Sequence, residues 1–447
     1  MKLQTFFVET WGCQMNVLDS KHLSGILKAR GLAPVAAVEE ADLALLNTCA
    51  VREKAVLKVL SRLGELRAAR QRGGRPRVVG LCGCVGEQEG AGMLSRIPAL
   101  SFILGPGRMA QLGGALDAVA AGDRPALTGF GASFEYDHEL IDRGPEARQL
   151  VTVIHGCNQR CTFCVVPNTR GREASRPLNK VVREVAALAR AGAREVTLLG
   201  QTVNAYRCPE TGADFGDLLG GVTAIGGLWK VQFVTSHPRF FTAQIIERMS
   251  QLPRLGSYLH LPFQAGSEAI LKRMRRGYTR AEFLEVVGRL REAIPGVTLS
   301  TDVIVGFPGE TEADFEQTLT LIEEVRFGQL YGFVFSPRPR TVAARYTDRV
   351  PPDEARDRLE RLFSLQDAIQ LDINRRLIGS RVEVLADGPA KRGVGIWQGR
   401  GSDNRVVNFP RSGGIRAGDL AMLTITGATA HALLGECQPP VEAGLPA

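Results

Sequence analysis

Three cysteines lie close together between Ile154 and Cys164, with the spacing Cys-x3-Cys-x2-Cys. Cys157, Cys161 and Cys164 would place three thiolates on one tight loop, with Phe163 directly before the last of them. A structural zinc site takes four protein ligands, and an iron–sulfur cluster is normally held by four thiolates. Three thiolates would leave one iron of a four-iron cluster with an open position. The spacing therefore predicts a cluster that binds a small molecule at that iron and reacts with it.

The main alternative for this loop is a zinc site in which His155 is the fourth ligand. Zinc motifs usually pair two groups of ligands, whereas this loop stands alone after the first strand of a long strand–helix region. We therefore favour the iron–sulfur cluster over zinc.

Three further cysteines, Cys13, Cys49 and Cys84, each follow a short apolar run. These runs, at 5–8, 43–46 and 77–81, predict strands that alternate with helices at about 20–29 and 53–72. Strand–helix–strand alternation gives a parallel sheet, in which the loops at the carboxyl ends of the strands gather along one edge. The three cysteines should therefore meet in space and form a second metal site.

The simpler reading is that these are separate buried thiols, because free cysteine often behaves as a small core residue. All three lie beside turn residues, which favours the metal site. Cys82 is two residues from Cys84 and should point to the opposite face of the sheet and pack there. Cys208 and Cys437 are isolated, and we expect them to be structural.

Composition sets broader limits. The chain has 447 residues, 44% of them hydrophobic, which suits two or three packed domains. Its net charge of +8 favours an anionic partner, although a solvated basic surface has the same charge. No signal peptide and no apolar run of the roughly 18 residues that a membrane helix needs is found. We expect a cytoplasmic protein with no membrane partner, whose clustered cysteines are metal ligands and not disulfides.

A second alternating region predicts six strands, at 150–154, 195–199, 230–235, 257–261, 297–305 and 331–335. Six strand–helix units make a partial parallel barrel, whose working face lies where the strands end. Polar residues stand at several of these ends, including Thr235–Pro238, His260 and Gln264, which we interpret only as a set. The predicted cofactor-binding residues are Phe163, Gly200, Gln201, Ser300 and Asp302.

Two groups of basic residues can each be interpreted in two ways. Arg170, Arg172 and Arg176 follow the cysteine loop and could bind a carboxylate or phosphate in a bidentate manner, or could be a solvated helix entrance. The run 272–276, Lys-Arg-Met-Arg-Arg, is most simply a charged helix face, although it could also contact RNA phosphates.

The end of the chain changes character. A charged helical stretch at 353–376 is followed by short β-rich pieces, at 381–385, 404–409 and 420–425, between Gly-rich turns. This pattern predicts a small β-barrel. Residues 381–427 contain seven Arg or Lys and four Asp or Glu, a net charge of +3. The barrel is therefore either an RNA-gripping appendage or a generic small barrel.

At these residues the chain resembles the methylthiotransferase family of radical S-adenosylmethionine (SAM) enzymes. The resemblance covers nearly the whole chain. It includes Thr10–Asn16, Asn47-Thr48-Cys49, Gly83-Cys84-Val85, the cysteine loop with its Arg-Gly-x-Glu-x-Ser-Arg continuation, and the segments 260–267, 300–310 and 404–409.

The architecture that this resemblance implies is α/β with three domains. These are a methylthiotransferase amino-terminal domain at 1–125, a radical SAM partial (βα)6 barrel at 145–376 and a TRAM RNA-binding β-barrel at 378–440. In the family pattern Cys13, Cys49 and Cys84 hold an auxiliary 4Fe–4S cluster, and Cys157, Cys161 and Cys164 hold the cluster that cleaves SAM.

The implied reaction adds a methylthio group to carbon 2 of N(6)-isopentenyladenosine, next to the anticodon of tRNA. One SAM supplies the methyl group, and a second is cleaved to a radical that abstracts hydrogen from the base. The implied partner is the anticodon stem-loop, bound by a monomer; the sequence identifies neither the sulfur donor nor the reductant. The trio Gln14-Met15-Asn16 favours this substrate over threonylcarbamoyl-adenosine or a ribosomal-protein aspartate. An alternative of another class is a metal-containing RNA-binding protein without catalysis.

One segment departs from the family pattern. Arg340 and Val342 stand where the family usually has Gly and Pro. We expect the conformation of the loop at 336–342 to be affected, with no cluster ligand touched.

Overall fold

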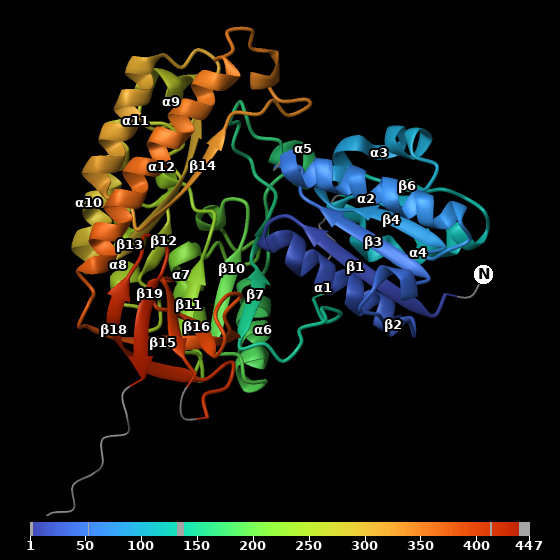
Figure 1. The fold of residues 1–447 in the computed structure, drawn as a ribbon, viewed down its shortest axis with the longest axis horizontal. Coiled ribbons are helices and arrows are strands. Elements are labelled where there is room, and N and C mark those ends of the chain that lie inside the picture. Colours follow the sequence, from blue (N-terminus) through green and yellow to red (C-terminus); the bar gives the residue numbers. More distant parts are fainter. Residues whose placement is uncertain (1–2, 52, 132–137, 412–413, 438–447) are drawn as a thin grey trace, which may run out of the picture.

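The computed structural model describes residues 3–51, 53–131, 138–411 and 414–437. They form an amino-terminal α/β region, a central strand–helix region and a small carboxyl-terminal barrel, which lie side by side in Figure 1. The predicted α/β fold class with these three parts is confirmed. The last residues of the predicted third domain, 438–440, lie outside the described residues. Among the described residues, no helix is both long and apolar enough to cross a membrane.

The amino-terminal region is one parallel sheet with the strand order β2-β1-β3-β4-β5-β6. Two apolar clusters cover its two faces, one containing Cys84 and the other Cys82. The predicted opposite orientation of these two side chains is therefore confirmed. The strands are β1 (Thr5–Trp11), β2 (Ala33–Pro34), β3 (Leu43–Thr48), β4 (Val78–Cys82), β5 (Phe102–Leu104) and β6 (Ala126–Leu127), and the helices are α1 (Gln14–Ala29), α2 (Glu53–Gln71), α3 (Cys84–Arg96) and α4 (Leu112–Ala120).

The central region has six parallel strands in two hydrogen-bonded groups, β7-β10-β11 and β12-β13-β14. A parallel bridge between Val231 and Leu255 links the groups, so the strands curve into a partial barrel in chain order. This confirms the predicted barrel of six strand–helix units. The strands are β7 (Arg148–Thr152), β10 (Glu195–Leu199), β11 (Lys230–Phe233), β12 (Tyr258–His260), β13 (Thr298–Val305) and β14 (Gln329–Val334).

Helices cover the outside of this barrel and bury one large core with the outward faces of the strands. Three of them begin with capping boxes, at Asp214, Thr279 and Thr311, which satisfy free backbone donors of the first turn. Phe283, Val287 and Leu290 form a buried stripe along the second of these three helices, α10 (Arg280–Ala293). The helices are α6 (Leu178–Arg190), α7 (Phe215–Thr223), α8 (Ala243–Ser250), α9 (Glu268–Met274), α10 (Arg280–Ala293), α11 (Glu312–Val325) and α12 (Pro352–Arg375); the short α5 (Val166–Arg170), β8 (Ile154–His155) and β9 (Ala174–Ser175) lie between β7 and α6.

The carboxyl-terminal region is a closed five-stranded barrel. The sequence predicted only three of its strands, and one of them begins later than expected. Residues 404–405 belong to a turn instead, because Asn404 has a φ of 64° and the Asp403 carboxylate accepts a hydrogen bond from the Arg405 amide. The strands are β15 (Arg381–Pro389), β16 (Ile396–Gly401), β17 (Val406–Pro410), β18 (Leu420–Ala428) and β19 (Leu433–Cys437).

This small barrel closes the amino-terminal end of the parallel barrel. Glu195, on β10, is buried and lies 3.0 Å from Arg148 and 3.1 Å from Lys230. Lys230 Nζ also donates to the Gly401 carbonyl, and Arg148 donates to the Leu385 carbonyl. Buried charges on the first three strands are thus neutralised by one another and by backbone oxygens of the small barrel.

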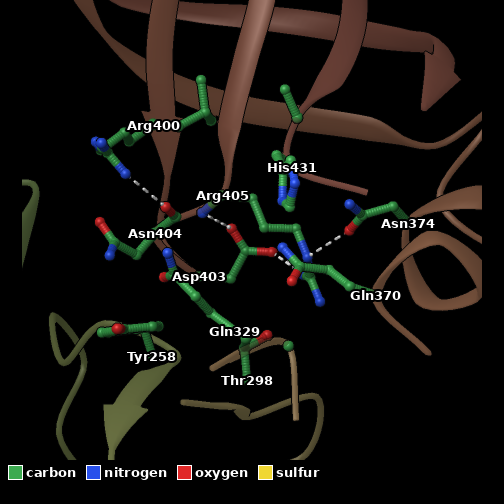
Figure 2. A pocket seen from close by; sticks show the side chains of 13 residues that line it. Tyr258, Thr298, Gln329, Gln370, Asn374, Arg400, Asp403, Asn404, Arg405 and His431 are labelled. Atoms are coloured by element: carbon green, nitrogen blue, oxygen red, sulfur yellow. Dashed lines mark hydrogen bonds and ion pairs between the residues drawn. The ribbon is translucent and has the colours of Figure 1, made fainter. Parts of the chain in front are cut away.

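A second contact lies beside this one. Figure 2 shows Arg405 between Asp403, with which it forms an ion pair, and Asn374 at the end of α12. The Asn374 amide in turn donates to the Thr429 carbonyl at 2.9 Å. The small barrel is therefore tied to the last helix of the parallel barrel as well as to its strands.

These contacts predict a strong effect of Glu195→Leu. The substitution leaves Lys230 buried without its counter-ion, and breaking a buried pair in this way costs roughly 3–5 kcal/mol. We expect a lower melting temperature and faster proteolysis between residues 376 and 381. The double variant Glu195→Leu/Lys230→Met removes both charges and should recover much of the stability. A single variant as stable as the parent chain would contradict the assigned role of this pair.

Candidate active site and metal centres

The first group of thiols lies at the carboxyl edge of the amino-terminal sheet. Cys13 follows β1 and caps α1, Cys49 follows β3, and Cys84 begins α3 after β4. These three strands are neighbours in the sheet, so the loops after them gather as the sequence predicted.

The thiols of this group interact. A hydrogen bond between the Cys13 and Cys49 thiols is the main cause that lowers the pKa of Cys13 to about 6 and raises the pKa of Cys49 well above its ordinary value. The charge of Cys13 also acts on Cys84, whose pKa burial raises. The structure therefore brings all three predicted ligands of the first site together.

Two asparagines bind the loops of this site to one another. Asn16 Oδ1 lies 3.3 Å from Cys13 Sγ, and the Asn47 amide donates to the Asn16 carbonyl at 2.8 Å. A side chain at Gly83, which has a φ of 85°, would come within 2.3 Å of Asn47 Oδ1. Asn16 and Asn47 belong to the motifs that carry the family resemblance. The structure shows that they fix the positions of the cysteine loops relative to one another.

A buried arginine from the central region reaches the same site. Arg170, the last residue of α5, donates through Nε to Cys84 Sγ at 3.3 Å and pairs with Asp19 of α1 at 2.6 Å. Burial raises the pKa of Asp19, and the charge of Arg170 opposes this shift. Arg170 does bind a carboxylate, as one of the two sequence interpretations allowed, but that carboxylate belongs to the chain itself. Arg176 pairs with the internal Glu184, and Arg172 is exposed.

The second group of thiols lies on the loop between β8 and α5, at the carboxyl ends of the barrel strands. Cys157 Sγ is 3.2 Å from the Thr202 hydroxyl and accepts a hydrogen bond from the Gln159 amide. Burial raises the pKa of Cys164 to about 12, and the charges of the other two thiols act in the same direction. The loop therefore holds Cys157, Cys161 and Cys164 near one another.

Arg276 is the counterpart of Arg170 at this second group. It is fully buried, donates through Nη1 to Cys161 Sγ at 3.3 Å, and donates through Nη2 to the Pro262 carbonyl. The interpretation of residues 272–276 as a charged helix face is therefore wrong for Arg276. The pattern of charged residues along the helix does not reveal the burial of Arg276, because this residue lies after the end of α9, where the chain turns.

The donor set fits two iron–sulfur clusters. Arg170 Nη1 is buried beside Cys84 and has no hydrogen-bond partner, as expected of a donor that faces a cluster sulfur. Among the described residues, no group of three or more His, Cys, Asp or Glu side chains is spaced for a single metal ion. In a four-iron cluster each thiolate binds a different iron. His155, the fourth ligand in the zinc alternative, is buried in β8.

Three of the predicted cofactor-binding residues, Phe163, Gly200 and Gln201, lie in loops at the mouth of the barrel, and the other two, Ser300 and Asp302, lie within β13. Gln201 Oε1 accepts a hydrogen bond at 2.5 Å from the Gly156 amide, directly before Cys157. A side chain at Gly200 would meet Ile154 at 2.5 Å, so packing against Ile154 already accounts for this glycine. Phe163 is partly buried against the core.

Ser300 and Asp302 point into the barrel from β13. The Ser300 hydroxyl is buried, donates to the Tyr258 hydroxyl at 2.7 Å and lies 2.8 Å from His260 Nδ1. The Asp302 carboxylate is about one third exposed and lies 3.4 Å from His260 Nε2. Asp302 is thus the more accessible of the two predicted contacts.

A cavity of about 570 Å³ opens beside the cysteine loop. It is lined by β8, β9 and residues close to them in the chain, together with residues of the segment 205–209, and does not include any of the five predicted cofactor-binding residues. Its polar lining includes His155, Asn158, Glu173, Arg176 and Arg207.

Helix α1 places the first thiol group against the barrel mouth. Met15 and Leu18 pack with Leu199 of β10, and Cys13 is part of the same apolar cluster. The Thr152 hydroxyl on β7 lies 3.8 Å from Met15 Sδ. Leu199 stands two residues before Gln201, which binds the other cysteine loop, so one strand end contacts both sites.

The loop at 336–342 provides another link between the two regions. Arg340 has a φ of 63°, a conformation that glycine adopts without strain, which accounts for the glycine usual at this position in the family. Here the arginine side chain donates to the Gln88 carbonyl on α3, and Arg338 donates to the Val51 carbonyl near Cys49. The departure from the family pattern therefore adds a contact between the regions.

Comparison with known proteins matches this arrangement. The family described as Radical SAM superfamily matches residues 151–322, and the family described as Uncharacterized protein family UPF0004 matches residues 5–105. Among solved structures, the chain is similar to the radical S-adenosylmethionine methyltransferase TsrM from Kitasatospora setae, with a TM-score of 0.54 and 13% identity over 89% of this chain and 77% of that one. It is also similar to the cobalamin-dependent enzyme OxsB, with a TM-score of 0.52 and 13% identity over 82% of this chain and 56% of that one. At these identities the two structures show the fold alone.

Curated relatives are much closer in sequence. A tRNA-2-methylthio-N(6)-dimethylallyladenosine synthase from Syntrophotalea carbinolica is 40% identical over 97% of this chain and the whole of its own length. The protein of the same name from Anaeromyxobacter dehalogenans is 46% identical over 90% of this chain and 87% of its own. With two thiol groups at one barrel mouth and this similarity over its full extent, the chain belongs to the radical SAM methylthiotransferase family typified by these tRNA-2-methylthio-N(6)-dimethylallyladenosine synthases.

Proposed function

We propose that this chain adds a methylthio group to carbon 2 of N(6)-isopentenyladenosine next to the anticodon of tRNA. The observation that carries the proposal is the convergence of two three-thiol groups on the carboxyl ends of one parallel barrel. Cys13 packs with Leu199, and two residues later Gln201 holds the loop of Cys157. A reaction that combines a radical with a sulfur carrier requires two such groups side by side.

Each thiol group has a separate task in this proposal. When bound, two 4Fe–4S clusters and SAM supply a sulfur carrier, a methyl group and a 5′-deoxyadenosyl radical. Cys13, Cys49 and Cys84 would hold one cluster, and Cys157, Cys161 and Cys164 the other. The buried Arg170 and Arg276 each donate to one thiolate and so compensate negative charge at the two sites.

The tRNA substrate is supported by the names of the relatives, and the finer choice of base by the trio 14–16. Met15 packs against the barrel mouth and Asn16 contacts Cys13, so two of the three residues shape the site itself. We further propose that the protein acts as a monomer in the cytoplasm on the anticodon stem-loop. The alternative substrates are those of related methylthiotransferases, threonylcarbamoyl-adenosine and a ribosomal-protein aspartate.

Nucleoside mass spectrometry of tRNA from a deletion strain tests the proposal. The methylthio mark should disappear while the isopentenyl group remains. Loss of a methylthio mark from threonylcarbamoyl-adenosine instead, or an unchanged nucleoside profile, would contradict it.

The two thiol groups should be separable by mutation. Reconstituted parent protein should contain about eight irons, and Cys157→Ala or Cys13→Ala about four. Cys157→Ala should abolish formation of 5′-deoxyadenosine under reductant. Cys13→Ala should retain this cleavage and lose methylthio transfer, because it removes a ligand of the other cluster. Cys437→Ala, in the carboxyl-terminal barrel, is the matched control and should change neither. Normal methylthio transfer by Cys13→Ala would exclude the role given to the first group.

Arg170 should tune the first cluster. The double variant Arg170→Gln/Asp19→Asn removes both buried charges together, which avoids an uncompensated carboxylate. We expect a lower midpoint potential for the first cluster, since the hydrogen bond to Cys84 sulfur is lost and, of the two charges removed, that of Arg170 acts more strongly on Cys84. Redox titration followed by electron paramagnetic resonance measures this. Arg62→Gln removes a partly exposed arginine of the same region and should leave the potential unchanged. An unchanged potential in the double variant would mean that Arg170 has only a structural role.

A further inference from the structure

The inner face of the barrel carries a row of aromatic and polar side chains on its last three strands. Residues paired across parallel strands share a face, and the register pairs His260 with Ser300 and Asp302 with Tyr331. Ile304 pairs with Phe333 on the next inward position. Tyr331 and Phe333 therefore stand on the same side of the sheet as His260 and Asp302.

The side of β14 that carries Tyr331 and Phe333 faces the barrel interior, because the other side packs against an outer helix. A side chain at Gly332 would meet Leu359 and Leu362 of α12 at 2.8 and 3.0 Å, so the alternate residues of the strand face the outer helix. Leu330 is accordingly 8% exposed. Figure 1 shows α12 lying along β14 on that side.

Tyr331 and Phe333 are each 39% exposed although they face the barrel interior. Rings of this size usually bury most of their surface, and a contiguous exposed apolar patch inside a cavity marks a binding surface. β14 is the last strand of its group, and no described strand pairs with its other edge. The two rings are thus reached from the open edge of the barrel.

Neighbouring side chains hold the Tyr331 ring in place. Its hydroxyl interacts with the Tyr258 hydroxyl, an interaction that contributes to the raised pKa of Tyr258. Its ring packs edge-to-face against His260 at 6.0 Å, and His260 is fixed by Ser300 and Asp302. A ring that is anchored at its polar tip and edge, with its face exposed, loses little conformational freedom when a flat ligand stacks on it.

We propose that Tyr331 and Phe333 form a stacking platform for the target adenine of the substrate RNA, a role that rests on the proposed function. Single-stranded loop bases are recognised in RNA-binding proteins by stacking on aromatic rings. Chemistry on a base requires that it leave its stack and enter a pocket. The platform lies on the last strand of the barrel and the Cys157 loop follows the first, so both border the interior.

The adenine of SAM has the same flat chemistry, so the test has two arms. The first uses an anticodon stem-loop RNA with 2-aminopurine at the target position, whose fluorescence falls when the base stacks. Reconstituted parent protein should quench it. Tyr331→Leu and Phe333→Leu should each weaken binding of this RNA by about tenfold or more and reduce the quenching. Tyr331→Phe keeps the ring and should retain the quenching.

The second arm measures binding of labelled SAM and formation of 5′-deoxyadenosine by the same proteins. Both should be unchanged in the leucine variants, and the iron content and melting temperature should show that they are folded. Phe363→Leu is the control, because Phe363 is 38% exposed but belongs to α12 on the outer side.

Three outcomes would overturn the platform. The leucine variants could quench as the parent does, or they could lose SAM binding while they retain quenching, which would assign the rings to SAM. In the third outcome they methylthiolate tRNA with the KM of the parent. Because the parent chain is assayed for methylthio transfer in the same experiment, failure of the platform is distinguished from failure of the proposed function, in which the parent itself leaves tRNA unmodified.

Discussion

The buried ion pair between Arg170 and Asp19 joins the amino-terminal sheet to the barrel at the first thiol group. Both side chains are almost completely buried, so the charge of either one would be costly if the two regions separated. Arg170 ends the segment that begins with Cys157, and the residues between them include all three thiols of the second group. A single short segment therefore supplies one cluster site and, at its end, a donor to Cys84 of the other. The geometry of the two sites is therefore coupled directly through this segment.

The parallel strands explain why both thiol groups lie near this ion pair. Side chains at the carboxyl ends of parallel strands gather at one edge, in the sheet and in the barrel alike. Helix α1 covers part of the barrel mouth through Met15 and Leu18, and the small barrel closes the other end over Lys230 and Glu195. With that end closed and α1 over part of the mouth, the interior is bordered by the rest of the mouth and by the edge of β14, with which no described strand pairs and where the two exposed aromatic rings lie.

The sequence predicted those features that depend on local pattern. The cysteines at strand ends could be located because the alternation of strands and helices is visible in neighbouring residues. The burial of Arg170 and Arg276 could not, because their partners, Asp19, Cys84 and Cys161, are far away in the sequence. The cofactor-binding role of Gly200 stays a prediction, and the packing of Ile154 against it is a second reason for a glycine at this position. The turn at Asn404 was read as strand, because a positive φ at a non-glycine residue has no reliable signature.

The position of the small barrel limits how it can contribute to RNA binding. It lies at the amino-terminal ends of the strands, and β13 alone spans about 25 Å at the usual rise per residue. An RNA that contacts both this barrel and the mouth must therefore run along the outside of the parallel barrel. Arg400 and Arg405 are engaged by Asn404 and by Asp403, so they are unsuited to this contact. The basic residues that stay exposed are Arg381, Lys391, Arg392, Arg411 and Arg416. Under the proposed function, these exposed cations are the residues through which the small barrel would support the RNA.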